Sequence, residues 1–329
     1  LVGELISGEI FNSCAHGNVL ANRNLGLSKE GRYGGGFIGF MIGGTIRNSY
    51  ATGDVNVDAS EAGGFVGYME NSTIRESYAT GNVSVGRDGA GGFIGILSSA
   101  SGEDSGIYNS YSTGDVIFTN IENLTPEILE QVQLSDPTLY ESYGGFVGFN
   151  NDSRITRSYA TGNIIYDSPG FINPIDKGFT GRSQFNLVDP IIDNINNYWD
   201  TETSSQTLSG DNSIPLTTSQ MYQQNTFDNW NFDTIWQSNG LSYPTLRNNV
   251  ACQFTCFKPI PTSPAPIPPS LLFTPITASY SQSSVFFSNQ AADINSMQNG
   301  IFNEIRKTGT NGNIDEFVKM DLGSNQLIN

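Results

Sequence analysis

The sequence has 329 residues, of which 15 are Lys or Arg and 32 are Asp or Glu, so its formal net charge is -17. A surface with this excess of carboxylates repels phosphate backbones, so we expect no nucleic acid among its partners. No stretch reaches the roughly 20 apolar residues of a membrane-spanning helix, so we expect a protein that does not span a membrane.

The first part of the chain is built from two phrases that alternate in a fixed order. The glycine phrase, Gly-Gly-Phe-(Ile/Val)-Gly, begins at Gly35, Gly63, Gly91 and Gly144. The serine phrase, Ser-Tyr-(Ala/Ser)-Thr-Gly-(Asp/Asn)-(Val/Ile), begins at Ser49, Ser77, Ser110 and Ser158. The first three glycine phrases are 28 residues apart, whereas the fourth follows an insertion at residues 120–142. In that insertion, Thr125-Pro126-Glu127 has the residue types of a helix N-terminus.

The residues before Gly35 belong to the same array. Leu1-Val2-Gly3 matches the end of the glycine phrase, and residues 13–19 are a degenerate copy of the serine phrase. The sequence therefore begins inside a repeat, and we expect it to be a piece of a longer protein.

These repeats predict a β-solenoid. Their strand-like segments are three to five residues long, and Gly-Gly and Thr-Gly-Asx turns separate them. One unit cannot bury its own strands, but stacked units pair each strand with its equivalent about 4.8 Å away. We predict an all-β fold, a right-handed parallel β-solenoid with about one coil per 28-residue repeat and with glycines supplying positive-φ corners. Equivalent side chains then form ladders, assigned to Phe37, Phe65, Phe93 and Phe146 and to Tyr50, Tyr78, Tyr111 and Tyr159.

The phrase Gly-Gly-Phe-Val-Gly, followed by Ile-x-x-Ser-Tyr-Ala-Thr-Gly-x-Val, resembles the GLUG repeat of large bacterial surface proteins, especially of filamentous-haemagglutinin-like adhesins. Residues 197–203, 216–221, 230–236 and 243–247 are similar to the segment that often closes GLUG arrays. The resemblance thus covers about three quarters of the chain, residues 1–248. It implies an extracellular protein of the bacterial cell surface, although GLUG arrays occur in adhesins and in some surface peptidases alike.

The predicted organisation has four parts. Residues 1–169 form the solenoid, and residues 170–250 form an irregular segment that caps it. Residues 251–275 hold two cysteines and a proline-rich linker, which we expect to be extended. Residues 276–329 are a polar tail with expected helices at 291–303 and 314–322, and disorder, a docking module and an assembly segment remain alternatives for it.

Few residues are arranged for chemistry. The single histidine, His16, lies in the degenerate serine phrase, where we expect a corner residue. The glycines at 34, 36 and 39 have the spacing of a dinucleotide fingerprint, but its strand–turn–helix context is missing. The Asx position of the turns alternates between Asp and Asn, which favours turn chemistry over a row of calcium sites. We therefore predict no catalytic residue, no metal ligand and no cofactor.

Asp200 and Glu202 form the strongest acidic pair, beside Tyr198 and Trp199. Glycosidases use two carboxylates, and aromatic rings beside them stack on sugars. The pair also lies in the segment that resembles the array-closing sequence, where it needs no catalysis. We favour the structural role and keep a β-helix polysaccharide-acting enzyme as an alternative.

Cys252 and Cys256 are close enough in sequence to close a small disulfide loop in an oxidising compartment. The pair resembles the C-terminal hook that holds some two-partner-secreted adhesins in an outer-membrane secretion pore, although about seventy residues follow Cys256 here. The resemblance implies such a pore as a partner, and two unpaired buried cysteines are the alternative. Cys14 is left over, in a tyrosine position of the repeat.

The predicted function is that of a secreted adhesin or extracellular-matrix protein fragment, a non-catalytic stalk with a repetitive binding surface. Its partners would be glycans or proteins on host or neighbouring cells, bound through many weak contacts. A self-assembling filament subunit, binding copies of itself through an open solenoid end, is the alternative.

Overall fold

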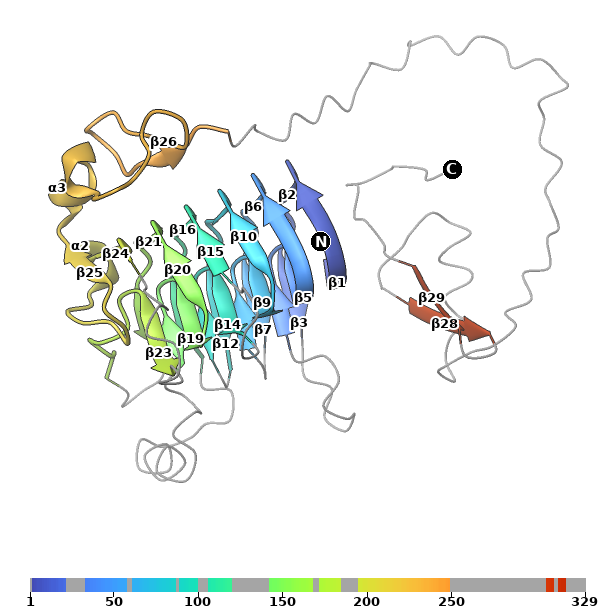
Figure 1. Ribbon diagram of the computed structural model, residues 1–329. Helices are drawn as coiled ribbons and strands as arrows, with labels where there is room; N and C mark the ends of the chain where they lie inside the picture. The colour runs from blue at the N-terminus through green and yellow to red at the C-terminus, as the bar shows by residue number, and fades with distance from the viewer. Residues whose placement is uncertain are drawn as a thin grey trace, which may run out of the picture. The chain divides into compact units, whose positions relative to one another are not determined.

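The computed structural model describes residues 2–21, 33–57, 61–86, 89–99, 106–119, 142–167, 172–184 and 195–248, and the backbone of 306–310 and 313–317. The chain divides into two units, Leu1–Cys252 and Gln253–Asn329. In the first unit, equivalent strands of successive repeats lie side by side and run parallel (Figure 1). The prediction of an all-β parallel solenoid is therefore confirmed.

Each coil passes through four parallel sheets, counted over the described residues. The longest segments form a nine-stranded sheet of β1 (Val2–Phe11), β5 (Ile38–Arg47), β9 (Val66–Glu70), β10 (Thr73–Arg75), β14 (Ile94–Ser98), β15 (Gly106–Tyr108), β19 (Val147–Asn151), β20 (Arg154–Thr156) and β23 (Thr180–Gln184). A seven-stranded sheet follows, made of β2 (Cys14–Ala15), β6 (Tyr50–Ala51), β11 (Tyr78–Ala79), β16 (Tyr111–Ser112), β21 (Tyr159–Ala160), β24 (Tyr198–Asp200) and β25 (Ile214–Leu216).

Two shorter sheets complete the coil. The five-stranded sheet contains β3 (Val19–Ala21), β7 (Val55–Val57), β12 (Val83–Val85), β17 (Val116–Phe118) and β22 (Ile164–Tyr166). The four-stranded sheet contains β4 (Tyr33–Gly35), β8 (Glu61–Gly63), β13 (Ala90–Gly91) and β18 (Tyr143–Gly144). The three-residue strands of the five-stranded sheet alternate, so that Val55 and Val57 are buried while Asn56 is exposed.

The register between coils follows the sequence repeat. Ile38 pairs with Val66, and Val66 pairs with Ile94, so one coil takes 28 residues. Ile94 pairs directly with Val147, so the register resumes after the insertion, whose predicted helix lies outside the described residues. Val147 pairs in turn with Thr180, and β24 and β25 extend the seven-stranded sheet. Parallel stacking therefore continues into the segment after residue 169.

Phenylalanine rings fill the interior of the coils. Their centroids lie 4.7 to 4.9 Å apart with interplanar angles of 4 to 14° along Phe37, Phe65, Phe93, Phe146 and Phe179. This spacing is the distance between paired strands, because each coil contributes one ring. Burying one such side chain contributes roughly 1.5–3 kcal/mol, so the ladder is a main stabilising feature of the stack.

The corners differ from the prediction. Glycines of the repeats were expected to supply positive φ, but the described glycines with positive φ are Gly8, Gly43 and Gly240. Left-handed corners are instead occupied in successive coils by Asn12, Asn48, Glu76, Asn109, Arg157 and Asn196. The repeat glycines are needed for space: a Cβ at Gly81 would overlap the carbonyl oxygen of Gly53 in the neighbouring coil. Close backbone approach, and not backbone conformation, therefore explains them.

After the last stacked strands the chain forms short elements over residues 195–248. These are α2 (Thr201–Ser204), α3 (Thr218–Met221), the 3-10 helix η1 (Gln224–Thr226), and the antiparallel pair β26 (Trp236–Gln237) and β27 (Thr245–Leu246). Tryptophans and phenylalanines of this part form one apolar cluster together with several tyrosines of the stack.

The second unit contains an antiparallel hairpin of β28 (Arg306–Thr310) and β29 (Asn313–Phe317). The helix expected at 314–322 is therefore wrong where it overlaps β29, and Asn311-Gly312 is the sequence signal for the two-residue hairpin loop. The helix expected at 291–303 lies outside the described residues.

Candidate functional site

The tyrosine ladder runs along the outside of the coils. Successive rings of Tyr50, Tyr78, Tyr111 and Tyr159 have centroids 4.8 to 4.9 Å apart and interplanar angles of 2°. The alanines that follow three of them point the other way, into the interior cluster with the phenylalanines. Tyr78 is partly exposed, and burial raises its pKa to about 12.

Residues 195–248 fold back over one end of this ladder. The Trp236 ring centroid lies 6.2 Å from that of Tyr111 and 6.0 Å from that of Tyr159. The Tyr159 hydroxyl donates to the Pro244 carbonyl oxygen at 2.9 Å, and burial raises the pKa of Tyr159. Figure 1 shows β26 above the strand ends of the stack. The C-terminal part of the ladder is therefore an internal interface, and no longer a surface that a ligand can reach.

Asp200 holds this returning segment in place. Its side chain is fully buried, and its Oδ1 accepts the backbone N–H groups of Glu202 and Thr203 at 2.8 and 3.2 Å, which caps α2. Its Oδ2 accepts the Tyr243 hydroxyl at 2.6 Å. Burial, followed by this hydrogen bond, raises the pKa of Tyr243. Both carboxylate oxygens are thus engaged with the protein itself.

Glu202 has a similar role one helix further on. Its Oε2 accepts the Thr218 backbone N–H at 2.9 Å, at the start of α3. Carboxylates stabilise helix N-termini in this way, because the first N–H groups have no partner within the helix. The geometry of the pair supports the structural role favoured from the sequence.

Serine hydroxyls form a second ladder that was not identified from the sequence. The Oγ atoms of Ser49, Ser77 and Ser110 each accept the backbone N–H of the equivalent serine in the neighbouring coil at 3.2 to 3.3 Å. The same three hydroxyls donate to carbonyl oxygens two residues earlier at 2.9 to 3.1 Å. The recurring first serine of the serine phrase was the available signal.

The Asx residues of the turns form a third ladder. Asn18, Asp54, Asn82 and Asp115 each accept, through Oδ1, the backbone N–H of the next Asx at 2.8 to 2.9 Å. Each contact needs only one acceptor oxygen, so Asp and Asn can both occupy this position of the turn. Within the described parts of the chain, no three His, Cys, Asp or Glu side chains gather as a metal site would need.

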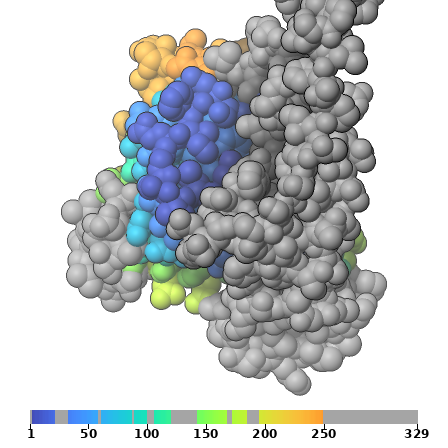
Figure 2. All heavy atoms as spheres, turned by 90° about the vertical axis from the view of Figure 1, so that its right-hand side faces the viewer, coloured from blue at the N-terminus to red at the C-terminus, as the bar shows by residue number. Residues whose placement is uncertain are grey.

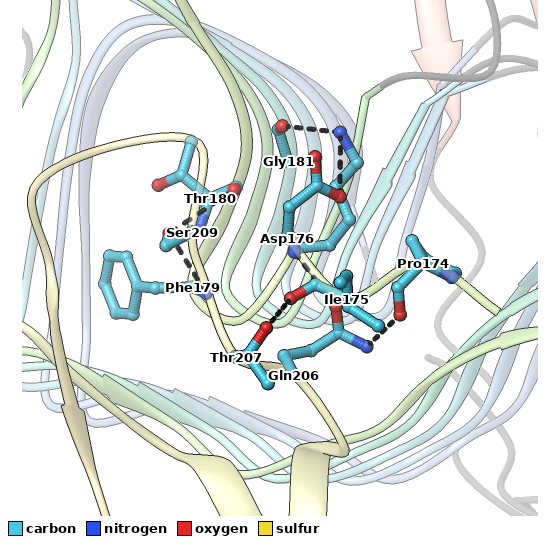
Figure 3. Close-up of polar contacts among 10 residues, drawn as sticks. Pro174, Ile175, Asp176, Phe179, Thr180, Gly181, Gln206, Thr207 and Ser209 are labelled. Atoms are coloured by element: carbon cyan, nitrogen blue, oxygen red, sulfur yellow. Dashed lines mark hydrogen bonds and ion pairs between the residues drawn. The ribbon is translucent and has the colours of Figure 1, made fainter.

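The C-terminal end of the stack is closed by polar contacts (Figure 3). The Gln206 side chain donates to the Pro174 carbonyl and accepts the Lys177 backbone N–H, both at 2.9 Å. Ser209 Oγ accepts the N–H groups of Phe179 and Thr180 at 3.3 and 2.9 Å. Phe179 itself was missed from the sequence because Gly178-Phe179-Thr180-Gly181 is a degenerate glycine phrase.

The remaining singled-out residues are dispersed. His16 is exposed after β2, with its Nδ1 2.8 Å from Thr52 Oγ1. The glycines at 34, 36 and 39 lie in β4, its turn and β5, so no helix follows the fingerprint there. Cys14 was expected to be left over, which is wrong, because it is disulfide-bonded. Cys252 and Cys256, the pair predicted to bridge, lie outside the described residues.

Comparison with known families identifies the repeats. Residues 30–56, 58–84 and 140–165 match the family described as the GLUG motif, so the chain carries GLUG repeats. The strands within residues 89–99 and 106–118 stack in the same register between the second and third matches. No curated protein and no solved structure matches the chain. Among the described residues, no helix is both long enough and apolar enough to cross a membrane.

Proposed function

We propose that this chain is part of a secreted adhesin or extracellular-matrix protein, and that its solenoid is a non-catalytic stalk with a repetitive binding surface. GLUG repeats occur in extracellular and cell-surface proteins, which supports a location outside the cell. The observation that carries the proposal is the uniform stack, in which the Asx ladder repeats on the exposed turns of successive coils, while the buried serine and aromatic ladders keep the coils in register.

The hydrogen bonds of Asp200 and Glu202 support a non-catalytic role. Asp200 and Glu202 cap helices and accept hydrogen bonds from the protein, which leaves the alternative of a polysaccharide-acting enzyme without its best residues. Weak contacts repeated along a stack raise the apparent affinity without any further chemistry.

The test is adhesion of fluorescent beads that carry the purified chain to cultured cells. We expect beads to be retained, and beads that carry an unrelated protein of equal net charge to wash off. Equal retention of both kinds of bead would overturn the proposal, because the net charge of the attached protein would then explain the retention.

The filament alternative has one observation in its favour. Among the described residues, β1 pairs on one side only, with β5, and Figure 2 views this end of the stack, formed by residues 2–21. Ile6, Phe11 and Leu20 are 66, 60 and 69% exposed there. A strand edge with apolar side chains takes up another strand, either of a further coil or of a second copy of this chain. Sedimentation of the purified chain over a concentration series distinguishes the two functions, since a filament subunit lengthens with concentration and a monomeric stalk does not.

A further inference from the structure

Arginines gather on one face of this acidic protein, where β10, β15 and β20 lie side by side. Arg47, Arg75 and Tyr108 are in register on neighbouring strands, on the opposite side of their strands from the buried isoleucines 46, 74 and 107. Arg157 occupies the corner directly after β20, one coil beyond Asn109. Neighbouring strands are about 4.8 Å apart, so these side chains share one patch.

The aromatic ring of Tyr108 is the centre of this patch. The guanidinium carbon of Arg75 lies 4.0 Å from the ring centroid, which is a cation–π contact. A Cβ at Gly106 would come within 2.7 to 2.9 Å of the tyrosine ring and hydroxyl, so the ring lies over this glycine. Arg157 donates from Nε to Asn109 Oδ1 at 3.0 Å, which fixes its guanidinium beside the ring's strand.

Two arginines of this patch lack an acidic partner within the described parts of the chain. Among the described residues, neither Arg75 nor Arg157 forms an ion pair with a carboxylate, in contrast to Lys177, which pairs with Asp176. Burial and the charge of Arg75 lower the pKa of Arg157, which means that the two guanidinium groups repel each other. Two arginines that flank the strand of Tyr108 and form no ion pair among the described residues are an arrangement that an external anion would stabilise.

The net charge of the protein does not prevent such binding. At physiological ionic strength the Debye length is about 8 Å, so carboxylates farther away than this are largely screened, whereas a guanidinium group in contact with a bound anion is not. Guanidinium groups bind planar carboxylates and sulfates through paired hydrogen bonds. Thr45 and Thr73, in register with each other, place hydroxyl groups beside the arginines on β5 and β10.

We propose that Arg75, Arg157 and Tyr108 form a binding site for the anionic groups of an acidic oligosaccharide, carboxylate or sulfate. The guanidinium groups bind the anion, Tyr108 holds Arg75 in position, and Thr73 offers a hydroxyl to the sugar. This inference rests on the proposed function, because an extracellular stalk meets acidic polysaccharides, and it names the ligand class of that function.

The test is titration of the full chain with three labelled hexasaccharides: a galacturonic acid hexamer, sulfated maltohexaose and neutral maltohexaose. We expect binding of at least one acidic probe, weakened by added salt, and no binding of the neutral probe. The acidic probe that binds more tightly identifies the group as carboxylate or sulfate. Binding of the neutral probe as tight as that of both acidic probes, or no binding of any, overturns the proposal.

Variants connect the binding to the site. Arg75→Gln and Arg157→Gln each remove one charge-assisted contact, and we expect each to weaken binding about tenfold or more. Arg182→Gln is the matched control, since Arg182 is also a guanidinium over a ring, 5.3 Å from the centroid of Phe149, on another part of the same sheet. Equal effects of all three substitutions, in proteins with unchanged thermal unfolding, overturn the site.

Two further outcomes are decisive. Tighter binding of a thymidine hexanucleotide than of either acidic hexasaccharide would show a general anion site and contradict the proposal. Adhesion of beads to cells together with no oligosaccharide binding would overturn this site while the proposed function stood, so the two failures are distinguishable.

Discussion

Single hydroxyl and carboxamide groups join one coil to the next. Each serine of the ladder accepts a backbone N–H from one coil and donates to a carbonyl of its own coil, so its hydroxyl acts as acceptor and donor at once. A polar residue that recurs in each repeat, as Ser77 does, therefore has a structural hydrogen-bonding role here.

Ser77→Ala should destabilise the protein. The substitution leaves the buried backbone N–H of Ser49 without this acceptor, which costs about 1–3 kcal/mol of unfolding free energy. Ser84→Ala, at a partly exposed serine of β12, is the control and should change stability by less than about 0.5 kcal/mol. Denaturant unfolding measures both, and equal effects would show that the serine ladder has no special role.

The tyrosine ladder should make stability depend on alkaline pH. Burial raises the pKa of Tyr78 from 10.0 to about 12, so the folded protein retains this proton more strongly than the unfolded chain does. The stabilisation is complete below pH 10.0 and is lost as the pH rises through the folded pKa of about 12. We expect Tyr78→Phe to lose less thermal stability than the wild type when the pH is raised across this window. A steeper loss in the variant would contradict this assignment.

Close stacking of neighbouring coils requires a glycine, which has no Cβ, at the middle position of the Thr-Gly-Asx turn. Gly81 lies against the backbone of the neighbouring coil, whereas Gly17, in the same turn of the first coil, has no atom within 4 Å of the point where a Cβ would lie. The same residue type in the same turn therefore has a structural requirement in one coil that is absent in the other.

Gly81→Ala should accordingly cost about 2 kcal/mol or more, because the added methyl group meets a carbonyl oxygen that cannot move without separating the coils. Gly17→Ala should be close to neutral, within about 0.5 kcal/mol. Thermal unfolding of the two single variants is the measurement. A neutral Gly81→Ala would mean that the coils are packed less closely than the backbone distances indicate.

Asp200 joins two elements, α2 and the segment that contains Tyr243. Asp200→Ala removes a helix cap, worth about 0.5–2 kcal/mol, and leaves the Tyr243 hydroxyl without this acceptor. We expect a loss of about 2–4 kcal/mol and a lower unfolding temperature for the residues after β24. Tyr243→Phe, which keeps the cap, should cost less, and a larger effect of Tyr243→Phe would contradict the capping role.

The stack itself could be predicted from the sequence, and the returning segment could not. A period of 28 residues places Phe65 over Phe93 and Tyr50 over Tyr78 whatever the details of the turns. The contact between Tyr159 and Pro244 spans 85 residues and depends on aromatic packing, for which no periodic pattern exists. The prediction of glycine at the left-handed corners was also wrong. Asparagine tolerates the left-handed region and occupies most of these corners, whereas the repeat glycines lie where neighbouring backbones are in close contact.

For the whole first unit, these features describe a stack of similar coils, and the function proposed for it relies on many weak contacts. Asp200 and Glu202 form hydrogen bonds within the protein. In the arginine patch, Arg75 contacts the ring of Tyr108 and forms no ion pair among the described residues. The function proposed for this chain is therefore binding without catalysis.

The most direct test follows the adhesion of beads to a layer of acidic polysaccharide as the number of chains per bead is increased. We expect retention to rise more steeply than the number of chains, because each added chain binds within an already tethered bead. We also expect the polysaccharide to keep its length after prolonged contact. Retention strictly proportional to the number of chains, or a polysaccharide shortened by the wild type and not by Asp200→Asn, would contradict the proposed function.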